Sequence, residues 1–151
     1  YLGVEPVRFN SALVSAQNRN RLFWTNIDFD LPDDKGIILA DILEDGITDR
    51  AKSHCLDANY FKGGNLKSYF EKHRRQLVFK EFLKDDWPLL DHAKSKYLSH
   101  LSFRKLTPLE CERLQTVPDN YTNHVSNTQR YKMLGNGFTV DVVAHILKGL
   151  H

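Results

Sequence analysis

The sequence is poor in cysteine and has no long apolar segment. Its 151 residues include two cysteines, Cys55 and Cys111, which lie in unrelated contexts and lack the spacing of metal ligands. We therefore expect a reducing, intracellular setting, with neither a disulfide framework nor a metal site. No apolar run approaches the roughly 18 residues that a membrane-spanning helix needs, so no membrane partner is expected.

The amino terminus has neither an initiating methionine nor a secretory signal. Its first ten residues, YLGVEPVRFN, lack the basic and then apolar layout of a signal peptide. A chain of this length can hold one domain with its own core, or one and a half smaller domains. We therefore expect the chain to be cut from a longer protein.

Neither basic nor acidic residues are in large excess over the other. Lysine and arginine number 21 against 19 aspartates and glutamates, which gives a formal net charge of +2. This mild balance permits a nucleic-acid partner only if the basic residues gather on one face. The hydrophobic fraction of 41% and the charged fraction of 26% are typical of a globular protein.

The first part of the sequence predicts a pair of strands, and the residues that follow show a less regular hydrophobic pattern. Residues 7–14 and 21–29 are rich in strand formers, and the polar segment SAQNRN joins them. After the LPDDKG turn, residues 39–46 predict a short helix that ends at Gly46. Residues 49–100 show no clean period. Within them, 71–88 fit a helix, a strand followed by a helix, or a strand pair, with an end at Pro88.

The last third predicts three helices from their capping residues. TPLECERLQTVP carries a capping box, Thr107 with Glu110, and extends to Pro118. SNTQRYKML carries a second box, Ser126 with Gln129, and ends at Gly135. A final helix is expected to begin after Thr139, its predicted cap. Its predicted apolar face consists of Val140, Val143, Ile146, Leu147 and Leu150.

QNRNR places two guanidinium groups in the connection between the two predicted strands. In an extended segment Arg19 and Arg21 would share a face, so both could converge on one anion or polar ligand. The alternative is a solvated turn that carries two surface arginines. The segment by itself favours this second interpretation.

GNGF, residues 135–138, separates the last two predicted helices. Glycines here would let the backbone approach a ligand closely, and the helix that follows could offer N–H groups to a carboxylate or phosphate. The alternative is an ordinary helix ending and a tight turn. A single G-x-G is a weak signal by itself.

NYFKGGNLKSYFEKHRR mixes basic and aromatic side chains. Such a mixture suits phosphate contacts and base stacking around a flexible glycine pair. The alternative is a solvated charged face whose aromatic residues turn into a small core. The residues concerned are Tyr60, Phe61, Tyr69 and Phe70 with Lys62, Lys67, Lys72, Arg74 and Arg75.

The order of these motifs resembles the C-terminal part of the DNA cytosine-5 methyltransferases. Their eighth motif is Q-x-R-x-R, and their ninth is R-x-L-T-x-x-E-x-x-R-L-Q-x-x-P, which residues 104–118 match without a gap. Their tenth motif, a G-N-(S/G)-x-(S/T)-V helix start, matches residues 135–140. The likeness spans nearly the whole chain, and VSAQNRNRLFW and VSNTQRYKMLGNGF are most similar to bacterial and phage enzymes and the animal de novo methyltransferases.

The resemblance implies roles for the eighth and tenth motifs. Arg21 would contact a cytosine flipped out of double-stranded DNA, while Arg19, supported by Gln17, would contact the catalytic loop or phosphates. The methyl donor would be S-adenosylmethionine, whose methionine end would be lined by Asn136, Gly137 and Phe138. Many relatives have serine at the Gly137 position, so one side-chain hydrogen bond to the donor is not expected here.

The ninth motif and the region before it would serve target recognition. Arg104, Glu110 and Arg113 are expected to organise this region without touching substrate. The residues expected to contact DNA are Lys52, Asn59, Lys62, Gly63, Asn65, Arg74 and Arg75.

Three family elements have no match in this sequence: the F-x-G-x-G donor loop, the P-C-Q catalytic loop and the E-N-V glutamate. Cys55 and Cys111 lack the proline-cysteine context of the nucleophile. We therefore expect the C-terminal portion of a bacterial or phage-encoded, cytoplasmic restriction-modification enzyme, inactive alone, whose partners are DNA and a missing N-terminal catalytic portion. The alternatives are a non-catalytic DNA-binding remnant or subunit of a split methyltransferase, and a structural partner without DNA affinity.

The resemblance also implies the fold class, α/β. A strand pair and a returning helix would belong to a Rossmann-like methyltransferase domain, into which a small α+β target-recognition domain is inserted. The expected divisions are 1–30 for the end of the catalytic domain, 31–125 for target recognition and 126–151 for the helical return.

Overall fold

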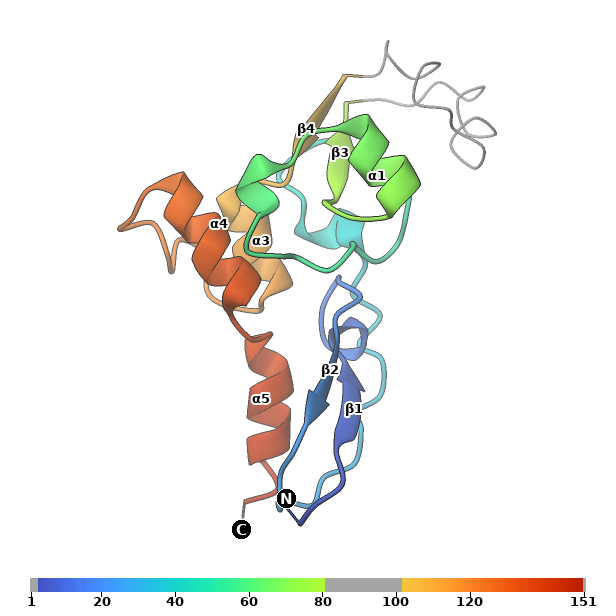
Figure 1. Cartoon of the computed structure of the whole chain (residues 1–151), viewed down its shortest axis with the longest axis vertical. Helices are drawn as coiled ribbons and strands as arrows, with labels where there is room; N and C mark the ends of the chain where they lie inside the picture. Colours follow the sequence, from blue (N-terminus) through green and yellow to red (C-terminus); the bar gives the residue numbers. More distant parts are fainter. Residues whose placement is uncertain (1–2, 81–101, 151) are drawn as a thin grey trace.

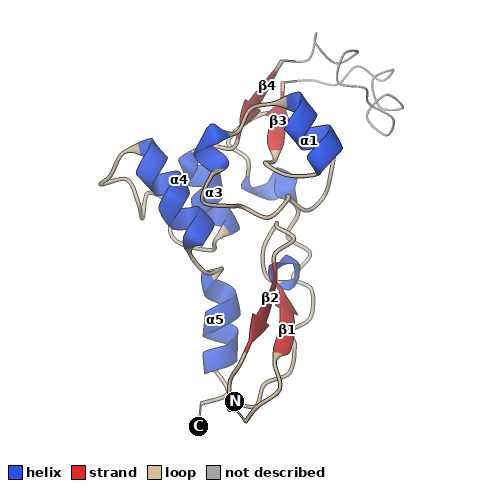
Figure 2. Cartoon of the chain, viewed as in Figure 1, coloured by secondary structure: helices blue, strands red, loops and turns tan. Residues whose placement is uncertain are grey.

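The computed structural model describes residues 3–80 and 102–150. Two antiparallel strand pairs and four α-helices make up its regular structure (Figures 1 and 2). In chain order the elements are β1 (Val7–Asn10), β2 (Asn20–Phe23), α1 (Leu66–Lys72), β3 (Leu77–Phe79), β4 (Phe103–Lys105), α3 (Pro108–Leu114), α4 (Asn127–Asn136) and α5 (Val140–Leu147). Among these residues, no helix has the length and apolarity needed to cross a membrane.

The predicted strand pair is confirmed, but both strands are short. β1 and β2 pair in antiparallel register from Val7 opposite Phe23 to Asn10 opposite Asn20. Asn10 ends the first strand because its side chain accepts hydrogen bonds from the backbone N–H groups of Ala12, at 3.1 Å, and Arg19, at 3.0 Å. A 3₁₀ turn at Ser11–Leu13 follows, and within SAQNRN Gln17 makes an isolated parallel bridge with Ser53 before β2 begins at Asn20.

Helix α5 lies alongside this hairpin (Figure 1). Phe9 and Val14 form a core with Val142 and Ile146 of the helix. The predicted apolar face is therefore wrong in part, since Val140, Leu147 and Leu150 are 44%, 48% and 62% exposed. A two-stranded hairpin is narrow, so a single row of α5 side chains is enough to cover it. The apolar residues on either side of that row remain exposed.

A second core joins the middle of the chain to α3 and α4. Its members include Leu39, Leu56, Leu106, Leu114 and Leu134. The capping box of α3 is confirmed, because Thr107 accepts from the Glu110 N–H while the Glu110 carboxylate accepts from the Thr107 N–H. Ser126 caps α4 by accepting from the Gln129 N–H at 3.4 Å, but the second predicted box is incomplete, because the Gln129 side chain makes no reciprocal bond. The predicted helix at 39–46 is a single 3₁₀ turn, Leu39–Ile42.

The region without a clean sequence pattern folds into a small sheet and a helix. β3 pairs with β4 from Leu77 opposite Lys105 to Phe79 opposite Phe103, and Tyr69 of α1 packs against β3. Residues 71–80 therefore end a helix and then form a strand. Pro88, the expected end of this pattern, lies outside the described residues.

Candidate active-site surface

Gln17 is fully buried and connects the hairpin to α3. Its side-chain amide donates to the Leu114 carbonyl oxygen at 2.8 Å and to Gln115 Oε1 at 3.0 Å. Its own oxygen accepts from the Leu56 N–H at 3.3 Å. Because every contact is internal, Gln17 holds the arginine-bearing connection in place.

Arg19 is buried as well, with 6% of its surface exposed. Its guanidinium donates to the Leu56 carbonyl oxygen at 2.7 Å and to the Gly137 and Gly135 carbonyl oxygens at 2.9 and 3.3 Å. Burial lowers the pKa of Arg19, although arginine remains protonated at neutral pH. These contacts favour a structural role, in which Arg19 joins the hairpin to the end of α4, over the predicted contact with phosphates.

Arg21 is exposed, in contrast to Arg19. Its guanidinium reaches the carbonyl oxygen of the neighbouring Asn20 at 2.7 Å and the Cys55 sulfur at 3.5 Å. Cys55 also lies 3.4 Å from Arg19 Nη1, so the thiol contacts both arginines of the motif. The exposed guanidinium retains donors that can meet a ligand.

One cavity brings the two sequence motifs together. It has a volume of about 350 Å³ and opens between the hairpin and the start of α5. Arg21 lines it together with all three residues predicted to hold the methyl donor. The full lining comprises Ser11, Arg19, Arg21, Leu22, Phe23, Trp24, Asn136, Gly137, Phe138, Thr139 and Val142.

The start of α5 differs from the prediction in its polar contacts. The Thr139 side chain does not cap the helix, because its hydroxyl bonds with the Ser11 hydroxyl at 2.8 Å and with Gln115 Oε1 at 2.9 Å. The Val140 and Asp141 N–H groups donate to the Gln115 carbonyl oxygen and the Thr116 hydroxyl. An anion that bound the Val140 and Asp141 N–H groups would therefore have to displace the acceptors that these groups already have within the chain.

Leu22 and Trp24 line the cavity but were not among the predicted site residues. Leu22 follows Arg21 directly and Trp24 lies three residues after it, and the two are 45% and 51% exposed. The signal available in the sequence was a large aromatic residue, Trp24, shortly after a charged motif. Sequence alone does not show whether such a residue packs in the core or lines a cavity. The pairing of Ser11 with Thr139 gave no sequence signal, because it joins positions 128 residues apart.

The residues predicted to contact DNA differ in their surroundings. The ammonium group of Lys52 is held by three carbonyl oxygens, those of Ala12 and Ile37 at 2.7 Å and that of Ser15 at 3.2 Å. These bonds favour a structural role for Lys52, since they tie its loop to the hairpin. Lys62 lies over the Phe61 ring, with its nitrogen 5.5 Å from the ring centre.

The other members of the predicted DNA surface include both structural and exposed positions. Asn65 caps α1 by accepting from the Ser68 N–H at 3.0 Å, and Gly63 approaches the Tyr60 carbonyl too closely for a Cβ. Asn59 and Arg74 are exposed. Arg75 is half-buried with a left-handed φ of 61°, and its Nε has no hydrogen-bond partner among the described residues.

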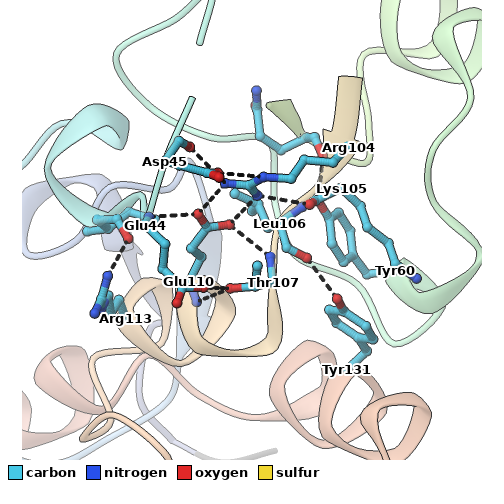
Figure 3. A network of polar contacts seen from close by, with 12 residues as sticks. Glu44, Asp45, Tyr60, Arg104, Lys105, Leu106, Thr107, Glu110, Arg113 and Tyr131 are labelled. Atoms are coloured by element: carbon cyan, nitrogen blue, oxygen red, sulfur yellow. Dashed lines mark hydrogen bonds and ion pairs between the residues drawn. The ribbon is translucent and has the colours of Figure 1, made fainter. Parts of the chain in front are cut away.

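The ninth-motif residues form a polar network around the buried carboxylate of Glu110 (Figure 3). Arg104 donates to both Glu110 oxygens at 2.8 Å and also pairs with Asp45. Hydrogen bonds from Arg104 to these two carboxylates raise the arginine's pKa. Glu110 also accepts from the Glu44 N–H at 2.9 Å. The network joins residues 44–45 to β4 and α3, and its role in placing the DNA-recognition region stays a prediction.

Cys111 offers no reactive thiol, and the described part of the chain holds no cluster of metal-ligating side chains. Cys111 is fully buried, and burial raises its pKa well above the ordinary value. A buried, protonated thiol is a poor nucleophile. Within residues 3–80 and 102–150, histidine, cysteine and carboxylate side chains form no group of three that could hold a metal ion.

Comparison with known proteins supports the interpretation of these motifs. The family model described as C-5 cytosine-specific DNA methylase matches residues 44–151. The type II methyltransferase M2.ScrFI of Lactococcus lactis subsp. cremoris is 32% identical over 160 residues, which covers 89% of this chain and 41% of that protein.

Two solved methyltransferases share the fold. The Entamoeba histolytica methyltransferase EhMeth superposes with a TM-score of 0.62 at 14% identity, covering 97% of this chain and 52% of the solved one. Spodoptera frugiperda DNMT2, solved as a mutant, gives a TM-score of 0.60 at 17% identity, covering 93% and 55%. The chain thus spans about half the length of the proteins it resembles. It belongs to the C-5 cytosine-specific DNA methylase family.

Proposed function

We propose that this chain supplies part of the cytosine and methyl-donor pockets, together with the DNA-recognition region, of an S-adenosylmethionine-dependent DNA cytosine-5 methyltransferase. The observation that carries the proposal is the shared cavity, which Arg21 lines together with Asn136, Gly137 and Phe138. A base held by Arg21 and a donor held by the loop before α5 would meet in this one space. The reacting groups would then be brought together by binding alone.

Arg21 is the group suited to the flipped base. Attack on the cytosine ring drives negative charge onto the ring oxygen, and a cation held in advance stabilises that charge. The guanidinium is exposed, is supported only by a neighbouring carbonyl and a thiol, and keeps further donors for a ligand. Arg19 would act indirectly, because its bonds hold Gly137 and the connection that carries Arg21.

The residues at the end of α4 fit one end of the donor. S-adenosylmethionine supplies an electrophilic methyl group, and its methionine end offers a carboxylate and an amine. The exposed Asn136 amide and the exposed Phe138 ring can meet the polar and apolar parts of that end, while Gly137 keeps the backbone accessible. The carbonyl oxygen of Gly137 is fixed by Arg19, so this part of the pocket is rigid.

We infer that the attacking thiol comes from outside the described residues, because Cys111 is buried and neither cysteine has the proline-cysteine context of the nucleophile. We infer that a catalytic portion before this chain provides the thiol and the rest of the donor pocket. We also infer the domain limits 1–30, 31–125 and 126–151. On this basis the chain alone should transfer no methyl group.

A chimaera tests the proposal. This chain would replace the matching region of the Lactococcus lactis methyltransferase, and transfer of radiolabelled methyl groups to DNA would be measured. We expect transfer by the chimaera and none by the chain alone. Arg21→Ala should reduce turnover by about 100-fold or more, with DNA affinity nearly unchanged, since one lost oxyanion donor has about this effect.

The matched control is Arg8→Ala, which removes another exposed arginine from the same hairpin. An equal loss of turnover from both variants would contradict the role of Arg21. DNA binding by an inactive chimaera would instead favour a non-catalytic DNA-binding subunit.

A further inference from the structure

Gln115 holds the loop before α5 from inside the molecule. It follows the last residue of α3 and is 1% exposed. Its main-chain carbonyl oxygen accepts from the Val140 N–H at 2.9 Å. Its side-chain amide donates to the Leu134 carbonyl oxygen and, at 3.4 Å, to that of Gly137. These three partners lie before, within and after the GNGF segment, so a single residue holds the loop at its start, middle and end.

An amide is the group that satisfies every neighbour of this side chain. The Gln115 oxygen accepts from the Thr139 hydroxyl at 2.9 Å and from the Gln17 amide at 3.0 Å. Together with its two donated bonds, the side chain thus uses both N–H groups and both oxygen lone pairs, which is the full capacity of an amide. A carboxylate would place an acceptor against two carbonyl oxygens, and an apolar side chain would leave buried polar groups without a partner.

We propose that Gln115 is a positioning residue for the methyl donor, acting through the loop that carries Asn136 and Phe138. The inference rests on the proposed function and changes the role expected for the end of the ninth motif. The resemblance implies that the whole motif serves target recognition, and Arg104 and Glu110 near its start do contact residues 44–45. The side-chain bonds of Gln115 go instead to the hairpin connection and to the loop before α5.

The positions of the two donor-facing side chains depend on the loop backbone. Asn136 is exposed and Phe138 is 66% exposed, so packing restrains neither of them strongly. The backbone that carries them is held at the Gly137 carbonyl oxygen, to which Gln115 and Arg19 both donate. A loop that holds its binding conformation for only a fraction of the time binds its ligand more weakly by that fraction. Loss of the Gln115 contacts should therefore weaken donor binding and leave DNA binding and turnover at saturating donor nearly unchanged.

Kinetics of the chimaera described above provide the first test. Gln115→Met removes the amide and keeps the length of the side chain. We expect KM for S-adenosylmethionine to rise about tenfold, with kcat and KM for DNA changed less than about threefold. The matched control is Gln76→Met, which should leave KM for the donor within about twofold of the unmodified value. Gln76 is an equally buried glutamine, and its amide donates to the Tyr69 hydroxyl at 2.8 Å and the Leu77 carbonyl oxygen at 2.9 Å, away from the loop.

Hydrogen exchange of the chain itself gives a readout that does not depend on activity. The Gly137 N–H donates to the Met133 carbonyl oxygen at 2.8 Å, and the Val140 N–H donates to Gln115. Exchange over residues 134–142, followed by mass spectrometry, should be faster in Gln115→Met and unchanged in Gln76→Met. Thr139→Val is a milder second variant for the case that Gln115→Met does not fold, because it removes the hydroxyl that donates to Gln115. It should raise KM for the donor about threefold and speed exchange in the same segment.

Three results would overturn the inference and leave the proposed function intact. The first is an active chimaera in which Gln115→Met leaves KM for the donor unchanged. The second is a rise in KM for DNA as large as that for the donor, which would return Gln115 to target recognition. The third is equal exchange over residues 134–142 in Gln115→Met and Gln76→Met. An unmodified chimaera without activity would instead contradict the proposed function, and the role of Gln115 toward the donor with it.

Discussion

Replacing Arg19 with methionine should destabilise the chain far more than the same change at Arg21. The two residues are identical and two positions apart, yet Arg19 is 6% exposed and Arg21 lies at the surface. Methionine keeps most of the apolar stem and removes the guanidinium. The comparison therefore isolates the polar contacts of each side chain.

The expected size follows from the bonds that are lost. Arg19 donates to the carbonyl oxygens of Leu56 and Gly137 at 2.7 and 2.9 Å. A hydrogen bond to a charged group contributes about 1.5–3 kcal/mol, and each buried carbonyl left without a donor adds a desolvation cost of similar size. Removing the guanidinium also removes the desolvation penalty of its buried charge, which offsets part of this loss of stability. We expect a net loss of about 3 kcal/mol for Arg19→Met.

Arg21→Met should change the free energy of unfolding by less than about 0.5 kcal/mol, as surface substitutions usually do. Its bonds go to the adjacent Asn20 carbonyl and to a thiol, which is a weak acceptor.

Urea unfolding followed by circular dichroism measures both effects. With a denaturant slope of about 2 kcal/mol per molar, a loss of 3 kcal/mol moves the midpoint by about 1.5 M. The slope itself should stay constant if the native state remains intact. Equal midpoints for Arg19→Met and the unmodified chain would refute the structural role of Arg19, and so would an equal shift in Arg21→Met.

Burial acts to raise the pKa of Glu112, but hydrogen bonds from Thr122 and other donors hold it below the ordinary value. Its contribution to stability should therefore be complete above about pH 4.3 and be lost as the pH falls further. Melts from pH 6 to 2 should show a smaller decline in Glu112→Gln. Gly135→Ala should lower the melting temperature sharply, because its Cβ would lie 2.2 Å from the Asp57 carbonyl carbon. Arg74→Ala should reduce the salt dependence of DNA binding by about one unit of slope if this exposed arginine meets a phosphate. An unchanged slope would remove Arg74 from the DNA surface.

Local signals predicted the elements that depend on local bonds. The capping box of Thr107 and Glu110 joins residues three apart, so it is legible in the sequence and is present in the structure. The same holds for the Ser126 cap. The order of the eighth, ninth and tenth motifs along the chain was also sufficient to indicate the family.

The middle of the chain shows where such signals fail. α1 and β3 carry no clean period, because Tyr69, Leu77 and Phe79 are buried against one another in a small satellite core. Their burial depends on β4, which lies beyond residue 100 in the sequence. A hydrophobic pattern taken from a short stretch of sequence around α1 and β3 cannot include β4, the strand that buries them.

Sequence by itself determined the family and the caps, and it indicated that the two arginines and the GNGF loop belong to one site. Only the tertiary structure decided which arginine is buried and which is exposed. The reason is physical: Arg19 meets carbonyl oxygens from Leu56 and from the end of α4, which the fold brings together from distant parts of the chain. Burial depends on those long-range neighbours, and the local sequence N-R-N-R is the same for both residues.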